Sequence, residues 1–245
     1  MNDIKLSAKK KFYIYNTPGE YIFIPCRDGL YKITVVGGGG GGYGGGGFLE
    51  DKFPYQSSGG GGGSTTISLI ELTADYIYKL TVGNGGNGGS RSRKPGTMNR
   101  GANGGNSHFD EILEAYGGNG GCHHKQHEYE KISGSGGKAF GGDVNINGSD
   151  GKSGYYLTSE KKYLSAYENG GNSTHGTGGM GHIYKQIRQV PTACRHLGNG
   201  SGTDGHDGKG YGAGGGGAGF YSFNKRGYSG GSGSCGLIII EEMGD

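Results

Sequence analysis

The densest group of side chains able to bind a metal lies at Cys122, His123, His124 and His127, and Cys194 adds a distant thiol. Zinc sites use Cys and His at short, recurrent spacings, and the spacing here matches none of them. We therefore predict an exposed polar loop at this position. Cys122, His123 and His127 remain weak metal candidates, and we expect no bound metal or other cofactor.

Two glycine motifs resemble nucleotide-binding loops. Residues 83–88 match the pattern G-x-G-x-x-G, but a dinucleotide fingerprint also needs a helix opening at that point, and the following residues 89–96 do not predict one. Gly151-Lys152-Ser153 resembles the end of a P-loop, yet Ile146 occupies the position where the motif requires glycine. We predict that neither segment binds a nucleotide.

No arrangement of serine, cysteine and histidine carries a catalytic signature, because none pairs a nucleophile with a base on a recognisable scaffold. We predict that the protein is not an enzyme. The basic residues Arg91, Arg93, Lys94 and Arg100 lack any accompanying RNA-recognition sequence. We interpret them as a solvated loop and expect no nucleic-acid partner.

Three stretches without glycine, at 123–133, 155–169 and 182–197, are rich in Tyr, His, Lys and Arg. Tyrosine offers a large, rigid and amphipathic contact area, which suits recognition loops. These tyrosines have two interpretations: lids packed over the rest of the protein, or exposed contact residues. The receptor-contact candidates are Tyr155, Tyr156, Tyr163, Tyr167, Tyr184, Arg188, His123 and His124.

Glycine occupies 62 of the 245 positions and forms dense runs at 37–42, 44–47, 59–63 and 214–217. The net charge of only +3, together with 18 Tyr and 8 Phe, favours an ordered chain over a disordered one. Glycine also recurs at every third residue, as in an extended helix with three residues per turn. We predict that glycine is required where segments pack edge to edge. The predicted packing positions are Gly148, Gly151, Gly205, Gly208 and Gly215.

Alternating apolar residues predict strands over 12–15, 21–24 and 31–36, with a second pair of strands over 65–69 and 76–82. The closing run 237–240 is continuously apolar, which is typical of a strand buried on both faces. We expect it to pair near 31–36. Asn-Gly dipeptides are expected to mark tight reversals. They begin at Asn84, Asn87, Asn103, Asn119, Asn147, Asn169 and Asn199.

We therefore predict an all-β fold with almost no α-helix. Residues 1–82 form a strand base with the first glycine runs, 83–236 form a glycine-rich bundle with three long loops, and 237–245 return to the base. The start of the chain has no apolar signal segment, and no run is long enough to cross a membrane. We expect synthesis in the cytoplasm, no membrane insertion, and free thiols at the four cysteines.

Several segments carry a resemblance to a known family. They include "YIFIPCRDGLYKITVVGGGGGG", "YKLTVGNGGNGG", "NSHFDEILEAYGGNGG" and "GYGAGGGGAGF". In this order they are similar to the glycine-rich domain of phage tail-fibre and adhesin proteins and of related viral surface proteins, over most of residues 12–241. The resemblance implies packed polyglycine-II helices whose connecting loops contact the target. The three long insertions and the cysteines depart from the pattern.

On this resemblance we expect a non-enzymatic virion surface protein, a tail-fibre tip or adhesin that binds a host-surface protein or glycan. Other virion structural proteins are expected partners, and the protein is expected to be oligomeric or attached to an oligomer. One alternative is a structural subunit, such as a minor capsid, cement or filament protein, assembled through the bundle. Another is an ice- or polysaccharide-binding module.

Overall fold

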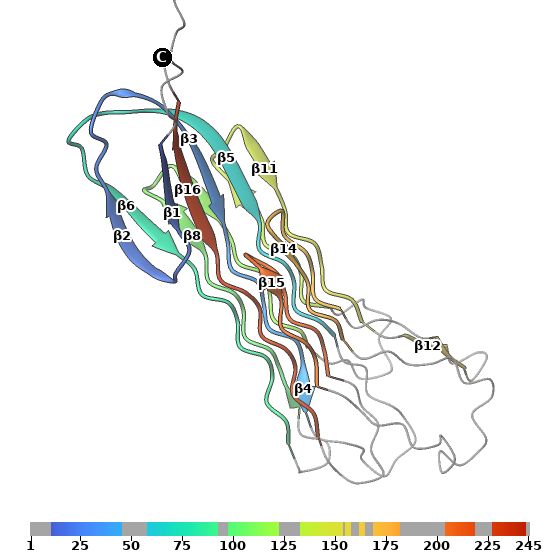
Figure 1. Ribbon diagram of the computed structural model, residues 1–245. Coiled ribbons are helices and arrows are strands. Elements are labelled where there is room, and N and C mark those ends of the chain that lie inside the picture. Colours follow the sequence, from blue (N-terminus) through green and yellow to red (C-terminus); the bar gives the residue numbers. More distant parts are fainter. Residues whose placement is uncertain are drawn as a thin grey trace, which may run out of the picture.

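The protein is an elongated all-β molecule, seen in a computed structural model that describes residues 11–45, 58–92, 98–122, 133–153, 155–157, 162–164, 169–181, 204–218 and 227–243. Within these residues all regular structure is strand, as predicted, and no helix is present. No helical segment of the described chain could therefore cross a membrane. Two sheets form a head at one end, and a shaft of glycine-rich segments extends from it (Figure 1).

The first sheet of the head joins the two ends of the chain. Its order is β1 (Phe12–Tyr15), β16 (Leu237–Glu242), β3 (Gly29–Val36), β5 (Thr65–Leu72) and β11 (Val144–Ile146), and every neighbouring pair is antiparallel. Leu237 lies opposite Val36, and Ile240 lies opposite Ile33. The predicted pairing of the closing strand with residues 31–36 is confirmed.

The second sheet has the order β10 (Ala139–Phe140), β9 (Leu113–Ala115), β8 (Ser107–Phe109), β6 (Tyr78–Val82) and β2 (Gly19–Phe23). The strands predicted over 65–69 and 76–82 therefore do not pair with each other, because β5 belongs to the first sheet and β6 to the second. The turn between them, where Asp75 has a φ of 59°, carries the chain from one sheet to the other.

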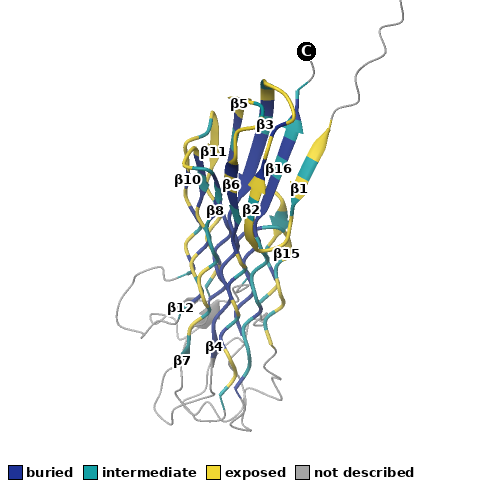
Figure 2. Ribbon diagram, turned by 90° about the vertical axis from the view of Figure 1, so that its left-hand side faces the viewer, coloured by how far each residue is buried: buried dark blue, intermediate teal, exposed yellow. Residues whose placement is uncertain are grey.

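The core of the head lies between the two sheets (Figure 2). The first sheet contributes Tyr31, Ile33 and Val35, which alternate with residues on its outer face, and the second contributes Leu80 and Phe109. All five are at most 1% exposed. Full burial of one such side chain contributes about 1.5–3 kcal/mol, so this core is the main hydrophobic source of stability in the described chain.

Three short strand pairs lie outside the head sheets. They are β4 (Gly44–Gly45) with β7 (Met98–Asn99), β12 (Tyr155–Leu157) with β13 (Lys162–Leu164), and β14 (Gly176–Thr177) with β15 (Lys209–Gly210).

The shaft consists of extended segments that lie side by side and are joined by backbone hydrogen bonds. Its most regular segment, 37–43, sends successive N–H groups to three different neighbours, and the order repeats every three residues. The bonds run from Gly37 to Ser64, Gly38 to Gly105, Gly39 to Ser234, Gly40 to Gly61, Gly41 to Ala102 and Gly42 to Gly231. Its N–H groups therefore point in three directions around the segment.

The uninterrupted glycine runs form the centre of the shaft. Gly40 donates to Gly61 at 2.9 Å, Gly60 donates to Gly215 at 2.9 Å, and Gly215 donates back to Gly40 at 2.8 Å. The runs at 37–42, 59–63 and 214–217 thus contact one another in a triangle. Neighbours surround each run, which explains why glycine occupies every position there.

Glycine is required in the shaft because the segments approach too closely for a side chain. If a Cβ atom were added to a shaft glycine whose surroundings the structure describes, it would lie less than 3.0 Å from an atom of a neighbouring segment. Real Cβ atoms essentially never approach another atom so closely. At the five predicted packing positions the obstructing atom is a carbonyl oxygen. The pairs are Gly148 with Gly62, Gly151 with Gly59, Gly205 with Gly216, Gly208 with Ala213, and Gly215 with Gly231.

Outer segments replace every third glycine by a polar residue, and this corrects the predicted role of the Asn-Gly pairs. Four of the Asn residues in these pairs lie along extended segments and not at reversals. Every third position of an outer segment faces away from the shaft, which leaves room for a side chain. The four are Asn84, Asn87, Asn103 and Asn119. Several Asn and Asp side chains instead accept an outer N–H group that has no backbone partner. Examples are Gly117 to Asn106, Gly120 to Asn103, Gly178 to Asn172, Gly181 to Asn169, Ser229 to Asp204 and Ser232 to Asp207.

The close approach at Gly215 predicts a large loss of stability for Gly215→Ala, because the new methyl group would overlap with the carbonyl oxygen of Gly231. We expect the free energy of unfolding to fall by several times the ~1 kcal/mol typical of a substitution. Asn84→Ala, at an exposed outward position, is the control and is expected to be nearly neutral. Thermal unfolding measures both, and equal small losses would contradict the packing argument.

The hydrogen-bond pattern also predicts which amide protons exchange slowly with solvent. Gly148, Gly151, Gly205 and Gly208 each donate to a backbone carbonyl at 2.8–3.0 Å. We expect these amides to be protected, and the amides of Gly40 and other central residues to exchange more slowly still. Fast exchange at all of them, measured by NMR or mass spectrometry, would show that the shaft is not stably ordered.

Candidate interaction site

The three glycine-poor stretches leave and re-enter the described structure at the end of the shaft farthest from the head (Figure 1). The residues that flank each stretch are joined by hydrogen bonds, directly or through residues 58–59. For the first, Cys122 bonds to Ser58 at 3.0 Å, and Gly134 donates to Gly59 at 3.1 Å. For the second and third, Lys152 donates to Asn169 at 2.8 Å, and His206 donates to Met180 at 2.9 Å. We call this end of the shaft the tip.

The structure places only part of the predicted contact set. β12 and β13 pair at the tip with Tyr156 opposite Tyr163 and Tyr155 opposite Leu164. The side chains of these tyrosines lie outside the described residues, as do Tyr167, Tyr184, Arg188, His123 and His124 altogether. The choice between lid and contact residue stays open for all of them.

Cys122 is the described member of the weak metal set. Burial raises the pKa of its thiol, and the nearby Arg100 lowers it to a smaller extent. Since the thiolate is the form that binds metal, the net shift disfavours ligation near neutral pH. The described residues hold no group of three His, Cys, Asp or Glu side chains suited to a metal ion, and His123 and His127 lie outside them.

Cys26, Cys122 and Cys235 are free thiols. Cys26 is exposed, whereas Cys235 is half-buried in the shaft and its Sγ lies 3.5 Å from the carbonyl oxygen of Asn16. Cys194 lies outside the described residues.

The segment that matches a dinucleotide fingerprint is part of the shaft. Gly83 donates its N–H group to Ser107 Oγ at 3.0 Å, Gly86 donates to Gly39 at 2.8 Å, and Gly88 donates to Ser232 Oγ at 3.4 Å. These N–H groups are therefore engaged and do not converge on a ligand. The segment continues β6 as an extended chain, without the helix that the fingerprint needs.

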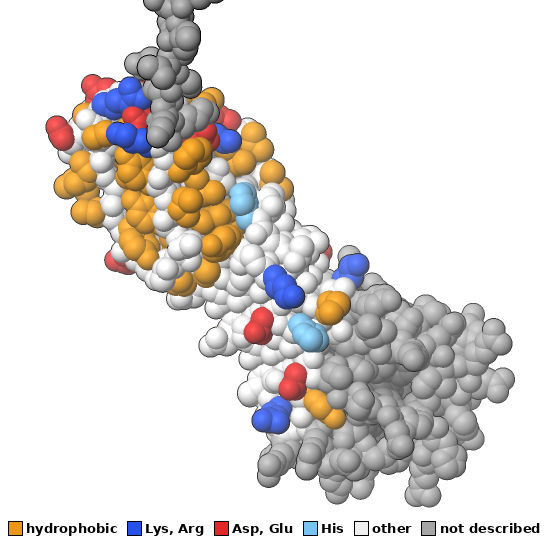
Figure 3. Space-filling view, viewed as in Figure 1, with side chains coloured by type: hydrophobic (Ala, Val, Ile, Leu, Met, Phe, Trp, Pro, Cys, Tyr) orange, Lys and Arg blue, Asp and Glu red, His pale blue; other side chains and the backbone are white. Residues whose placement is uncertain are grey.

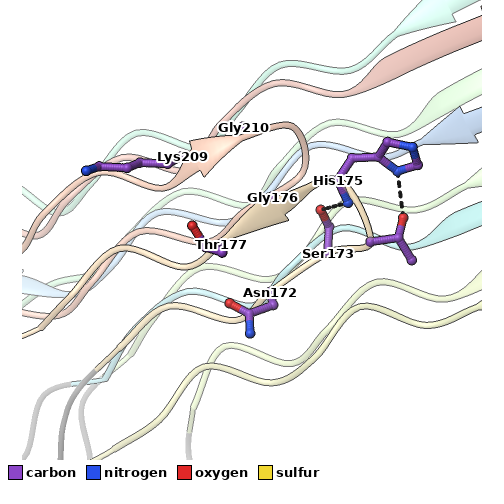
Figure 4. A pocket seen from close by; sticks show the side chains of 8 residues that line it. Asn172, Ser173, His175, Gly176, Thr177, Lys209 and Gly210 are labelled. Carbon is purple, nitrogen blue, oxygen red and sulfur yellow. Dashed lines mark hydrogen bonds between the residues drawn. The ribbon is translucent and has the colours of Figure 1, made fainter.

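A shallow pocket of 510 Å³ lies beside β14 and β15, where the shaft meets the head (Figure 4). Its lining comprises Asn172, Ser173, Thr174, His175, Gly176, Thr177, Lys209 and Gly210. His175 Nδ1 lies 2.7 Å from Thr174 Oγ1, and the His175 N–H group donates to Ser173 Oγ at 3.1 Å. Most of the lining residues have polar side chains, but the exposed lining surface is more apolar than polar and no set of charged groups converges there.

Sequence reasoning missed both this pocket and the exposed Met180 close to the tip, which is 60% exposed. The available signal for the pocket was the interruption of the glycine pattern by Ser173-Thr174-His175. Met180 carried no comparable signal, because an isolated Met between glycines does not reveal its exposure. Its flexible thioether side chain suits an adaptable contact surface.

Comparison with known proteins gives one family. Residues 16–241 match the family described as Glycine-rich domain. No curated protein matches the chain.

Partial desolvation of the His175 ring predicts a small pH dependence of stability, small because the residue remains exposed. This desolvation holds the pKa of the imidazole below its ordinary value of 6.5, so the unfolded chain takes up a proton before the folded one does as pH falls. The contribution of His175 is therefore favourable above about pH 6.5 and is lost at lower pH. We expect His175→Gln to reduce the drop in melting temperature between pH 7.5 and pH 5.5. An unchanged drop would assign the effect to other groups.

Proposed function

Because the chain belongs to the glycine-rich domain family, we propose that its shaft is a bundle of polyglycine-II helices. Such a helix has three residues per turn and no internal hydrogen bonds, so its backbone groups are free to bond to surrounding helices. The three-residue repeat of donors along 37–43 supports this proposal. The dense runs in the centre and the Gly-Gly-Asn pattern at the periphery support it as well.

We further propose that the protein is a non-enzymatic component of a virion surface, a tail-fibre tip or adhesin that binds a host-surface protein or glycan. The observation that carries this proposal is the position of the three glycine-poor stretches. Their flanking residues meet at the tip, at the opposite end from the head. Loops on a rigid scaffold commonly carry binding function, and these stretches are rich in Tyr, His and Arg.

The shaft holds the contact stretches away from the head in this proposal. Its shared hydrogen bonds fix the flanking residues, so each stretch begins and ends at a defined position. Fixing the ends of a loop lowers the entropy lost on binding. The head is then free to join the other virion proteins.

A structural subunit of a capsid or filament is the second candidate, and it is favoured by the exposed apolar residues Phe12, Ile14 and Leu69 on the first sheet of the head. Assembly through the glycine bundle itself has less support. The Cβ positions of the described shaft glycines point into neighbouring segments, which leaves no bare glycine face for another molecule. The same feature argues against an ice- or polysaccharide-binding glycine surface.

Alanine substitutions at Tyr155, Tyr156, Tyr163, Tyr184 and Arg188 test the proposal. We expect one or two of them to weaken attachment to host cells by about 2 kcal/mol, as in a binding hot spot, with an unchanged melting temperature. Tyr76→Ala is the control, because Tyr76 is an exposed tyrosine of the head. If all five variants attach normally but fail to enter particles or filaments, the structural-subunit function replaces receptor binding.

A further inference from the structure

The outer face of the first head sheet is unusually apolar for a surface (Figure 3). The strand register places Phe12 and Leu69 in one outward row, and Ile14, Ile239, Ile67 and Val144 in the next. Phe12 is 55% exposed and Ile14 is 59% exposed. We call these six residues the apolar face.

The outer face of the second sheet is more mixed. Its outward residues include the charged or polar Glu20, Lys79, His108 and Glu114 as well as the exposed Ile22 and Phe140, and His108 Nδ1 lies 3.6 Å from Glu114 Oε1. Antiparallel sheets with one wet face normally place polar residues on it. The first sheet therefore carries the larger cluster of outward apolar residues, which favours it as the face that is covered.

Part of the first sheet is already covered by the protein itself. Thr65 Oγ1 lies 2.6 Å from Thr174 Oγ1, the Asn16 amide donates to the Tyr211 hydroxyl at 3.1 Å, and Val36 is fully buried. These contacts belong to the chain around β14 and β15, which crosses the sheet next to the shaft (Figure 1). The apolar face lies in the rows beyond this cover and continues the same surface.

One ion pair crosses the apolar face. Lys32 and Glu241 lie in the same outward row on neighbouring strands, and Lys32 Nζ is 3.9 Å from Glu241 Oε2. The face therefore carries one charge of each sign. A twofold axis parallel to the strands, between β3 and β16, would place Lys32 of one copy opposite Glu241 of the other. An axis across the strands would tend to set like charges against each other.

We propose that the apolar face binds the same face of a second copy of this chain, around a twofold axis parallel to the strands. The contact is isologous, because the same residues serve both copies, and it resembles the aligned face-to-face packing of two sheets. Both shafts then extend in the same direction. The proposal does not depend on what the tip binds.

The size of the face sets the expected strength of the dimer. Five strands about 4.8 Å apart and two outward rows about 7 Å apart along them give a footprint on the order of 350 Å² on each copy. Two copies bury on the order of 700 Å², which is in the range of weak, transient contacts and below that of stable interfaces. We therefore expect a dimer that dissociates on dilution.

Sedimentation of the full chain over a range of concentrations tests the surface. Ile14→Asp places a charge in the apolar face and is expected to raise the dimer dissociation constant at least about tenfold. Ile22→Asp is the matched control, because Ile22 is 61% exposed on the edge strand β2 of the other sheet. It should leave the dissociation constant unchanged, and melting temperatures confirm that both variants fold.

Two charge variants test the axis by comparison with the wild type, because only the axis parallel to the strands sets opposite charges against each other in the wild-type dimer. Their mixture tests whether the two faces meet. Lys32→Glu chains carry two acidic residues on the face and Glu241→Lys chains carry two basic ones, so each alone should dimerise more weakly than the wild type. Mixed together, each acidic residue faces a basic one, and heterodimers should form at least about tenfold more tightly than either homodimer.

Four outcomes overturn the proposal. One is a monomer at every concentration up to about 1 mM, where a contact worth only about 4 kcal/mol would already be detected. Another is an equal effect of Ile14→Asp and Ile22→Asp. The third is a mixture of charge variants that associates no better than its components. A stable contact between wild-type protein and another virion protein at this face, without self-association, would also exclude the second copy as its occupant.

Discussion

The shaft depends on one constraint, which is that its backbones approach within hydrogen-bonding distance in several directions at once. A β-strand bonds to neighbours on two sides and leaves its two faces to side chains. Segment 37–43 instead bonds through its N–H groups to three neighbours and accepts bonds from others, including Gly86, Gly118 and Gly215. Such a segment has no face left for a Cβ. The constraint weakens at the periphery, where one direction faces water and Asn, Asp or Ser becomes possible.

The head and the shaft are therefore stabilised in different ways. The head buries large side chains such as Tyr31 and Phe109, whose transfer from water favours folding. The shaft gains about 0.5–1.5 kcal/mol net from each hydrogen bond, while its glycines lose more backbone entropy than other residues. These two effects are similar in size, so the shaft benefits from a preformed base. The strands provide one, because β3 runs directly into residues 37–43 and β16 receives residues 227–236.

Local patterns in the sequence were enough to predict the main strands, the pairing of residues 237–240 with 31–36, and an ordered glycine region. They were not enough to assign β5 and β6 to different sheets, because that choice depends on contacts between residues far apart in the chain. The Asn-Gly pairs were misread for a related reason. Asparagine also favours turns, and only the neighbouring segments reveal that Asn103 accepts a hydrogen bond from Gly120. At the candidate site, the sequence identified glycine-poor stretches but not that their ends meet at the tip.

The central triangle of glycine runs has a consequence for biosynthesis. Two of its members, at 37–42 and 59–63, are synthesised about 150 residues before the third, at 214–217. The strand β16, which lies between β1 and β3, comes later still. Neither the shaft centre nor the first sheet can be completed before residues 214–242 have been synthesised, and the abundance of long-range contacts is typical of slow folding. The nascent chain must keep its first two glycine runs solvated until the third run has been synthesised.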